Sequence, residues 1–251
     1  METNLKGKVA LVTGGGRDVG GDIARALAAE GAIVAVNYAR SKDEAQAVVQ
    51  SIEAGGGKAK AYQADISDNA QVKTMVAAIK SDFGTVDILV NNAGYVKYQR
   101  FVDSTPDEWK KQIDVCLYGA INCCHEVAPL MIAQNSGRII NLVGDSSRIG
   151  EANLALAAAA RGGTIALGKS LAREFGRNNI TVNTVSLGLI ETSHSDPEFL
   201  EKNREKIVKA YPLRRIGKPD DVAPMVTFLA AGASSWVTGQ VISVNGGFCM
   251  V

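Results

Sequence analysis

A run of glycines near the N-terminus is the first feature whose residue types could do chemistry. Residues 13–21 read Thr-Gly-Gly-Gly-Arg-Asp-Val-Gly-Gly and lie between a short apolar run and an amphipathic stretch. Glycines between a strand and a helix let the backbone approach a pyrophosphate, which then sits at the helix N-terminus. Gly14 and Gly20 are therefore candidate cofactor-binding residues, and a purely structural tight turn is the alternative.

Asp18 places a carboxylate within this run, where the turn would meet phosphate. An anion there repels a dinucleotide, and its side chain replaces a glycine that would allow close contact. Alternatively, Asp18 caps the N-terminus of the following helix. Either role predicts weaker cofactor binding.

Cysteine and histidine are the other residue types that could do chemistry. Residues 123–125 read Cys-Cys-His, but adjacent helical residues point to different faces and no partner cluster is evident, so we expect no metal site. His194 is expected to be a surface residue. The four cysteines form no spaced framework, which favours a reduced chain.

The elements that must position these residues are short apolar strands alternating with longer amphipathic helices. The predicted strands are Lys8–Val12, Ile33–Asn37, Ala59–Tyr62, Val86–Val90, Arg138–Val143, Ile180–Val185 and Gln240–Val244, and helical periodicity is clear in Val19–Glu30, Asp43–Ala54 and Asn69–Asp82. Apolar strands interleaved with helices predict an α/β fold: a single Rossmann-like, doubly wound parallel sheet of about seven strands flanked by helices.

The length of 251 residues suits one domain over residues 1–251. The polar segment 191–211 contains Pro197, is followed by Pro212 and interrupts the alternation before the last strand. We interpret it as a lid over the carboxyl edge of the sheet, with an ordinary pair of surface helices as the alternative.

Charge excludes several classes of function. The net charge is +1, from 27 basic and 26 acidic residues interspersed along the chain. We therefore expect no nucleic-acid partner and no membrane partner. The polar start of the chain carries no signal-peptide pattern, so a cytoplasmic location is expected.

Motifs along nearly the whole chain resemble those of the short-chain dehydrogenase/reductase family, specifically its 3-oxoacyl-carrier-protein-reductase-like branch. They are Thr13-Gly14 with Gly20, Asn91-Asn92-Ala93-Gly94, Gly137-Arg138-Ile139-Ile140-Asn141, the run 169–174, Ile180-Thr181-Val182-Asn183, the run 212–223, Thr238-Gly239-Gln240 and Asn245-Gly246-Gly247. The resemblance implies hydride transfer with a nicotinamide cofactor.

That chemistry, as the resemblance implies it, uses four side chains: a Tyr acid/base, a Lys that lowers the pKa of the Tyr and holds the ribose, a Ser that binds the substrate oxygen, and an Asn that supports a relay water. Counted from the flanking motifs, these positions are Ala157, Arg161, Gly144 and Cys116. All four differ from the family pattern, and Ala and Gly have no proton to give. A positioned general acid contributes roughly 10²–10⁴-fold. The resemblance therefore predicts a catalytically silent member.

Cofactor contacts are partly kept. Arg40 and Ser41 resemble the family's contacts to the 2′-phosphate of NADP, and Asp65 matches its adenine contact. Asn92 and Gly94 match backbone and ribose contacts. Residues 187–188 read Leu-Gly where the family has Pro-Gly near the nicotinamide. We predict no cofactor or weakly bound NADP.

Three hypotheses follow for the function. The first is a non-catalytic subunit of a hetero-oligomeric dehydrogenase, a tetramer by family resemblance, whose active homologous subunit binds NAD(P). It is similar to the two-gene dehydrogenases of anaerobic aromatic breakdown, such as the benzylsuccinyl-CoA pathway, which oxidise a hydroxyacyl-CoA; this analogy rests on no residue. The second is an active NADP-dependent oxidoreductase with relocated catalytic residues, for which Tyr95, Lys97 and Tyr98 are candidates. The third is a small-molecule sensor or carrier.

Overall fold

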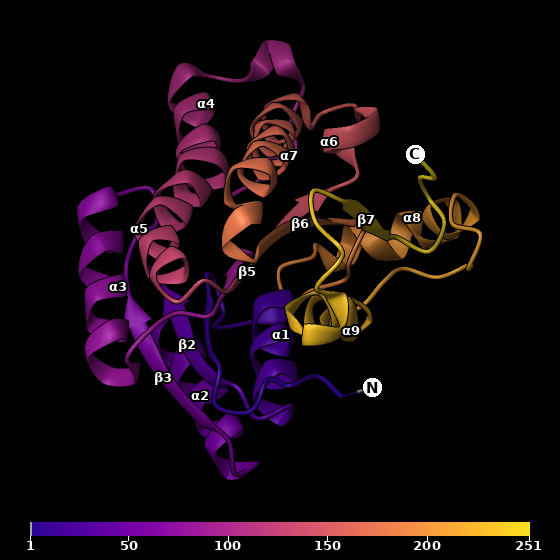
Figure 1. The fold of residues 1–251 in the computed structure, drawn as a ribbon. Coiled ribbons are helices and arrows are strands. Elements are labelled where there is room, and N and C mark those ends of the chain that lie inside the picture. The colour runs from indigo at the N-terminus through magenta and orange to yellow at the C-terminus, as the bar shows by residue number, and fades with distance from the viewer. Residues whose placement is uncertain (1) are drawn as a thin grey trace.

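Seven parallel strands form one sheet in the computed structural model, which describes residues 2–251 (Figure 1). The strand order is β3-β2-β1-β4-β5-β6-β7. The strands are β1 (Val9–Val12), β2 (Ile33–Tyr38), β3 (Lys58–Gln63), β4 (Ile88–Asn91), β5 (Gly137–Gly144), β6 (Ile180–Leu187) and β7 (Val241–Val244). The predicted doubly wound parallel sheet is confirmed, and each strand lies within three residues of its predicted bounds.

Helices cover both faces of the sheet. On one face α1 (Asp18–Ala29), α2 (Lys42–Ala54) and α9 (Pro219–Ala230) pack around one apolar cluster, and on the other α3 (Asn69–Phe83), α5 (Gly119–Ala133) and α7 (Ala155–Phe175) pack around a second. The remaining α-helices are α4 (Pro106–Ile113), α6 (Ser146–Ile149) and α8 (Pro197–Lys209). Figure 1 shows α8 at the side of the molecule near β7 and the C-terminus.

The central strands are apolar along their whole length because both faces are covered. All four residues of β1 are buried, and Leu11 and Val12 are inaccessible to solvent. Burying a Val or Leu side chain stabilises the fold by about 1.5–3 kcal/mol. In α1, Ile23 and Leu27 lie one turn apart and both face this core.

The strand order reverses between β1 and β4, which are hydrogen-bonded neighbours. In doubly wound sheets, ligands bind outside the carboxyl ends of the strands at such a reversal. The glycine-rich turn follows β1 and the Asn91–Gly94 motif follows β4. The fold therefore brings the two predicted cofactor segments together.

Within residues 2–251, one helical run, residues 106–133, is long and apolar enough by composition to cross a membrane. The run consists of α4, a π-helical turn at Asp114–Tyr118 and α5, and 44% of its most apolar window is buried inside the fold. A buried core helix passes the same test of length and composition. The longest charge-free stretch, Val222–Val251, holds most of α9 and the strand β7.

Segment 191–211 contains one helix, α8, instead of the pair considered as an alternative. Asp196 caps α8 by accepting hydrogen bonds from the backbone N–H groups of Glu198 and Phe199. Glu191 and Arg204 form a two-bond ion pair across the segment, at 2.9 and 3.3 Å. The segment is therefore ordered by its own polar contacts.

Candidate functional site

The Asn92 side chain holds the glycine-rich turn in place through hydrogen bonds. The Asn92 side-chain amide donates to the carbonyl oxygens of Thr13 and Gly14 at 3.0 and 3.2 Å. Gly14 has a φ of +59°, and a Cβ on Gly20 would collide with the Gly14 carbonyl and the Asn92 amide. The predicted residues Gly14, Gly20 and Asn92 thus form one tightly packed unit in which glycine is required.

Asp18 sits at the mouth of this turn with a left-handed φ of +47°. The N-cap of α1 is Arg17, and no side chain caps this helix end. The Asp18 carboxylate instead accepts a hydrogen bond from the backbone N–H of Ser193 at 2.8 Å and lies 3.2 Å from Nδ1 of His194. The capping alternative for Asp18 is therefore wrong, and His194, half-exposed, is part of this contact.

Arg161, at the position that the resemblance assigns to the catalytic Lys, contacts the segment after β4. It projects from α7 toward the end of β4, where its guanidinium group lies directly against Gly94. Nη1 donates to the Leu142 carbonyl of β5 at 2.5 Å. A Cβ on Gly94 would overlap this guanidinium. The Arg161 guanidinium thus lies beside Gly94, a residue that the resemblance assigns to cofactor contact.

The other three positions of the expected tetrad lie around Arg161. Ala157, one turn earlier on α7, is 2% exposed. Cys116 lies in the π-helical turn, where its thiol donates to the Tyr95 carbonyl at 3.3 Å and accepts from the Tyr95 N–H at 3.4 Å. Gly144 ends β5, and a Cβ there would meet only the Ser146 hydroxyl, at 3.5 Å. The fold therefore brings these positions together without a proton donor of the family's kind.

The adenosine end of the expected cofactor site is open. Arg40 is exposed, and within residues 2–251 its guanidinium makes no hydrogen bond or ion pair. Ser41 is the N-cap of α2 but makes no side-chain capping bond. Asp65 accepts hydrogen bonds from the backbone N–H and hydroxyl of Ser67 at 3.0 and 2.7 Å. Arg40 and Ser41 thus remain available to a phosphate, whereas the Asp65 carboxylate is engaged locally.

The candidates for relocated catalysis, Tyr95, Lys97 and Tyr98, lie in the loop after β4 but do not form a cluster. The Lys97 ammonium is paired with Glu108, and Tyr98 is 61% exposed. Tyr95 is half-buried, with the Lys111 ammonium 4.0 Å from its ring centroid. These contacts place the Lys97 and Tyr95 side chains against α4.

A buried polar network follows β5. Asp145 is 2% exposed and accepts 2.6 Å hydrogen bonds from the Ser186 hydroxyl and from the Asn245 amide. Asn245 also donates to the Cys249 carbonyl at 2.8 Å, and Arg148 donates to the Ser243 hydroxyl at 2.6 Å. The network joins the end of β5 to the C-terminal tail.

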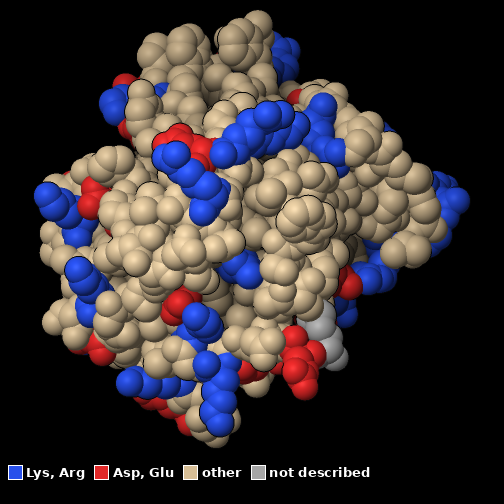
Figure 2. Space-filling view, in the orientation of Figure 1, with Lys and Arg blue, Asp and Glu red and all other residues tan. Residues whose placement is uncertain are grey.

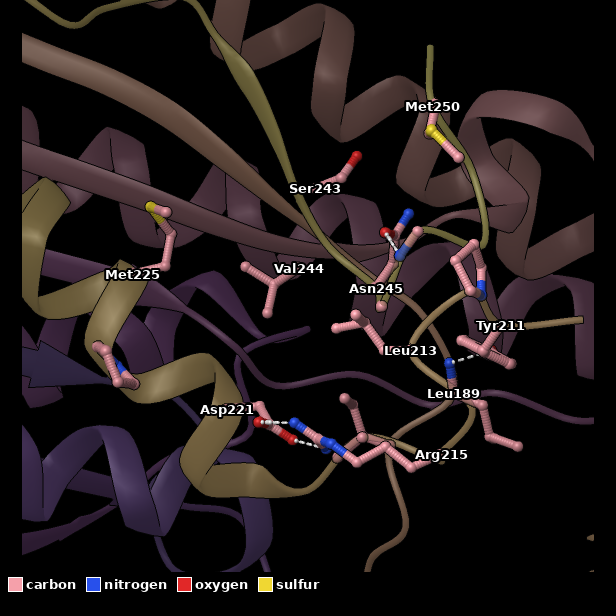
Figure 3. Close-up of a pocket in the computed structure, with 16 residues that line it drawn as sticks. Leu189, Tyr211, Leu213, Arg215, Asp221, Met225, Ser243, Val244, Asn245 and Met250 are labelled. Atoms are coloured by element: carbon pink, nitrogen blue, oxygen red, sulfur yellow. Dashed lines mark hydrogen bonds and ion pairs between the residues drawn. The ribbon is translucent and has the colours of Figure 1, made fainter. Parts of the chain in front are cut away.

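A cavity of about 630 Å³ lies between the loops after β6 and α8, helix α9 and strand β7. Its walls are mainly apolar, and Figure 3 shows the Arg215–Asp221 ion pair at one end and Met250 at the other. Arg215 binds the Asp221 carboxylate through two hydrogen bonds, of 2.5 and 2.6 Å. No predicted cofactor or tetrad residue lines this cavity.

Tyr211 lines this cavity, and its phenol is a candidate to replace the missing general acid. Its oxygen accepts from the Leu189 N–H at 2.8 Å, and burial raises its pKa, with the charges of Glu151 and Asp145 adding to the effect. A raised pKa makes a weaker acid at neutral pH, whereas the family chemistry needs a lowered one. Tyr211 is therefore a poor replacement for the missing Tyr.

Cys123 and Cys124, which are neighbours in sequence, are buried packing residues. Burial raises the pKa of both thiols, that of Cys124 to about 12, which keeps them protonated. Metals bind the thiolate. His125 points away and contacts Glu126 through Nδ1 at 3.0 Å. No group of three or more His, Cys, Asp or Glu side chains gathers among residues 2–251.

Charge on the surface is dispersed. Figure 2 shows Lys and Arg in separate clusters on one face, with wide uncharged areas between them and acidic side chains nearby. This face therefore lacks the continuous basic stripe typical of nucleic-acid binding.

Known proteins resemble this chain over its full length. A family model described as "Enoyl-(Acyl carrier protein) reductase" matches residues 15–249. A 3-oxoacyl-[acyl-carrier-protein] reductase of Staphylococcus epidermidis is 42% identical over 97% of this chain and 99% of its own length, and one of Synechocystis sp. is 39% identical over 99% of both. A crystal structure described as a short-chain alcohol dehydrogenase of Sinorhizobium meliloti is 31% identical, with a TM-score of 0.94 over 99% of this chain and 98% of that one.

Proposed function

Because the chain belongs to the short-chain dehydrogenase/reductase family, we propose that it keeps the family's fold as the non-catalytic subunit of a hetero-oligomeric NAD(P)-dependent dehydrogenase. The observation that carries this proposal is the position of Arg161. Its guanidinium lies against Gly94, where the family resemblance places the cofactor ribose.

We infer that the nicotinamide half of a dinucleotide binds poorly in this arrangement. Arg161 takes up the room beside Gly94, and the Asp18 carboxylate faces the position of the pyrophosphate. Two anions at close range repel each other in a partly desolvated site. No hydride-transfer step is therefore assigned to this chain, and NAD(P) belongs to the proposed partner subunit.

The proposed partner is a homologous short-chain dehydrogenase that has Tyr and Lys at the positions of Ala157 and Arg161. By the analogy drawn from the sequence, the substrate of the complex would be a hydroxyacyl thioester of coenzyme A. The proposed location is the cytoplasm, with an assembly of both subunits as the working form.

The second candidate is an active NADP-dependent oxidoreductase with relocated catalytic residues. The printed names of the relatives, which are reductases, favour this candidate over the first. The open Arg40 and Ser41 side chains fit the 2′-phosphate of NADP. The side chains inside the cleft favour the first candidate, because within residues 2–251 no Tyr or Lys lies at the four expected positions.

The test is purification of the tagged full-length chain from its native host, followed by mass spectrometry and dehydrogenase assays. The proposal expects a homologous subunit carrying the Tyr and Lys, with activity in the complex and none in the chain expressed alone. Turnover of acetoacetyl-CoA with NADPH by the chain alone would overturn the proposal and establish the second candidate. A small molecule bound without turnover, and no partner, would indicate a sensor or carrier instead.

A further inference from the structure

The contact between Asp18 and residues 193–194 joins two segments 175 residues apart in sequence. One carboxylate oxygen accepts the Ser193 N–H at 2.8 Å and the other lies 3.2 Å from the His194 ring nitrogen. The Asp18 side chain is only 20% exposed, although it is charged. Bonds in which the acceptor is ionised are about twice as strong as neutral ones.

The backbone at Asp18 is strained in order to make this contact. A φ of +47° is left-handed, which glycine adopts freely and other residues adopt at a cost, although Asp tolerates it better than most. The carboxylate does not cap α1, whose N-cap is Arg17. Among the described residues, its side-chain hydrogen bonds go to the 193–194 turn alone.

Hydrogen bonds connect the 191–196 turn internally and to α8. Within it, the Thr192 N–H donates to the Ser195 hydroxyl at 2.9 Å and the His194 N–H donates to the Thr192 hydroxyl at 3.3 Å. The turn leads directly into the Asp196 cap of α8, and the Glu191–Arg204 pair joins its start to the middle of that helix. Holding Ser193 in place therefore restrains the whole 191–211 segment.

We propose that Asp18 is a built-in latch that holds segment 191–211 closed over the glycine-rich turn in the absence of a dinucleotide. The latch does not depend on the proposed function, because it would restrain the segment equally in a silent subunit and in an active enzyme.

Hydrogen–deuterium exchange of the purified full-length chain tests the latch, read on peptides covering residues 189–196 and on the strands β1 and β4. Removing a hydrogen bond to a charged acceptor should speed exchange of the Ser193 amide by about tenfold or more in Asp18→Gly. Asp18→Asn keeps an acceptor oxygen and should give a smaller increase. Asp22→Asn is the matched control, because Asp22 lies one turn further along α1 and bonds only to Arg25.

Asp18→Gly also relieves the left-handed strain, so its melting temperature should stay equal to that of the parent or rise, while segment 191–196 loosens. An unchanged or higher melting temperature together with faster amide exchange in residues 191–196 separates a latch from a general structural role. Equal Ser193 exchange in the parent and Asp18→Gly would overturn the proposal. So would faster exchange in 191–196 that is matched by faster exchange in β1 and β4, since that would indicate overall destabilisation.

Discussion

The guanidinium group of Arg161 rests on the backbone of Gly94 and is fixed there by a 2.5 Å hydrogen bond to the Leu142 carbonyl. The two residues are 67 positions apart in sequence, on α7 and just after β4. This contact lies beside a residue that the family resemblance assigns to cofactor binding, and it can be tested without any cofactor.

Gly94→Ala should destabilise the chain by about 1 kcal/mol, the low end of the range for overpacking, because its methyl group overlaps the guanidinium at the mobile end of the Arg161 side chain. In an Arg161→Ala background the same substitution should cost markedly less. Urea unfolding of the four proteins of this cycle measures the coupling. Gly144→Ala is the control and should be close to neutral, because a Cβ there has room. Equal costs in both backgrounds would mean that Arg161 does not occupy this space.

Restoring the family side chains should restore chemistry if their absence is what silences the chain. The variant carries Cys116→Asn, Gly144→Ser, Ala157→Tyr and Arg161→Lys, together with Asp18→Gly to remove the carboxylate from the turn. We expect NADPH binding in a calorimeter and slow reduction of acetoacetyl-CoA. A sister variant with Ala157→Phe should lose about 10²–10⁴-fold of that rate, which is the usual contribution of a general acid. If both variants turn over equally, the new Tyr is not the acid.

Asp145 and Ser186 should behave as a coupled buried pair. Ser186→Ala leaves a 2%-exposed carboxylate short of one donor, so we expect a loss of about 1–3 kcal/mol of stability. Replacing both, with Asp145→Val and Ser186→Ala, should cost less than the sum of the two single changes. Chemical denaturation gives the four values. The single Asp145 variant should also loosen residues 245–251, read by exchange, because Asn245 loses its acceptor.

The Arg215–Asp221 pair predicts a dependence of stability on acid pH. The Arg215 guanidinium, which donates two hydrogen bonds to the carboxylate, lowers the pKa of Asp221 from 3.8 to about 2. A depressed carboxyl pKa contributes stability that is present above the unfolded value of about 4 and is lost as the pH falls toward 2. Asp221→Asn should therefore lower the melting temperature at pH 7 and converge with the parent near pH 2. The difference should shrink in high salt, because the pair is partly exposed. Asp220→Asn, at the adjacent exposed acid, should show no such convergence.

Sequence patterns predicted the sheet because strand signals are local. Runs such as 9–12 and 139–143 are apolar throughout, and in an alternating α/β chain that is enough to indicate parallel strands covered on both faces. The meeting of the β1 and β4 segments followed from the same reasoning, since the carboxyl ends of neighbouring parallel strands share an edge.

The features of the site that could not be predicted from the sequence depend on residues distant in the chain or on backbone angles. Asp145 follows a strand beside two serines and an arginine, a composition typical of a solvated loop, and its burial depends on residues 41 and 100 positions away. The outward turn of Asp18 depends on a positive φ, which no residue pattern near it specifies. The contact of the Arg161 guanidinium with Gly94 could not be predicted either, because the sequence around each residue carries no signal for the other.

The hydrogen bonds of Asn92 bear on how the stability of this chain depends on nucleotide concentration. Its amide satisfies the two carbonyl oxygens of the glycine-rich turn, so the turn keeps its shape through protein contacts alone. Proteins whose folded state binds a nucleotide gain stability by mass action as that nucleotide accumulates, by about 2.7 kcal/mol at a concentration 100 times the Kd. This gain depends on affinity alone, so under the proposed function, in which the dinucleotide belongs to the partner subunit, this chain would gain little from it. The level of the folded chain would then follow the proposed partner and not the size or redox state of the nicotinamide pool.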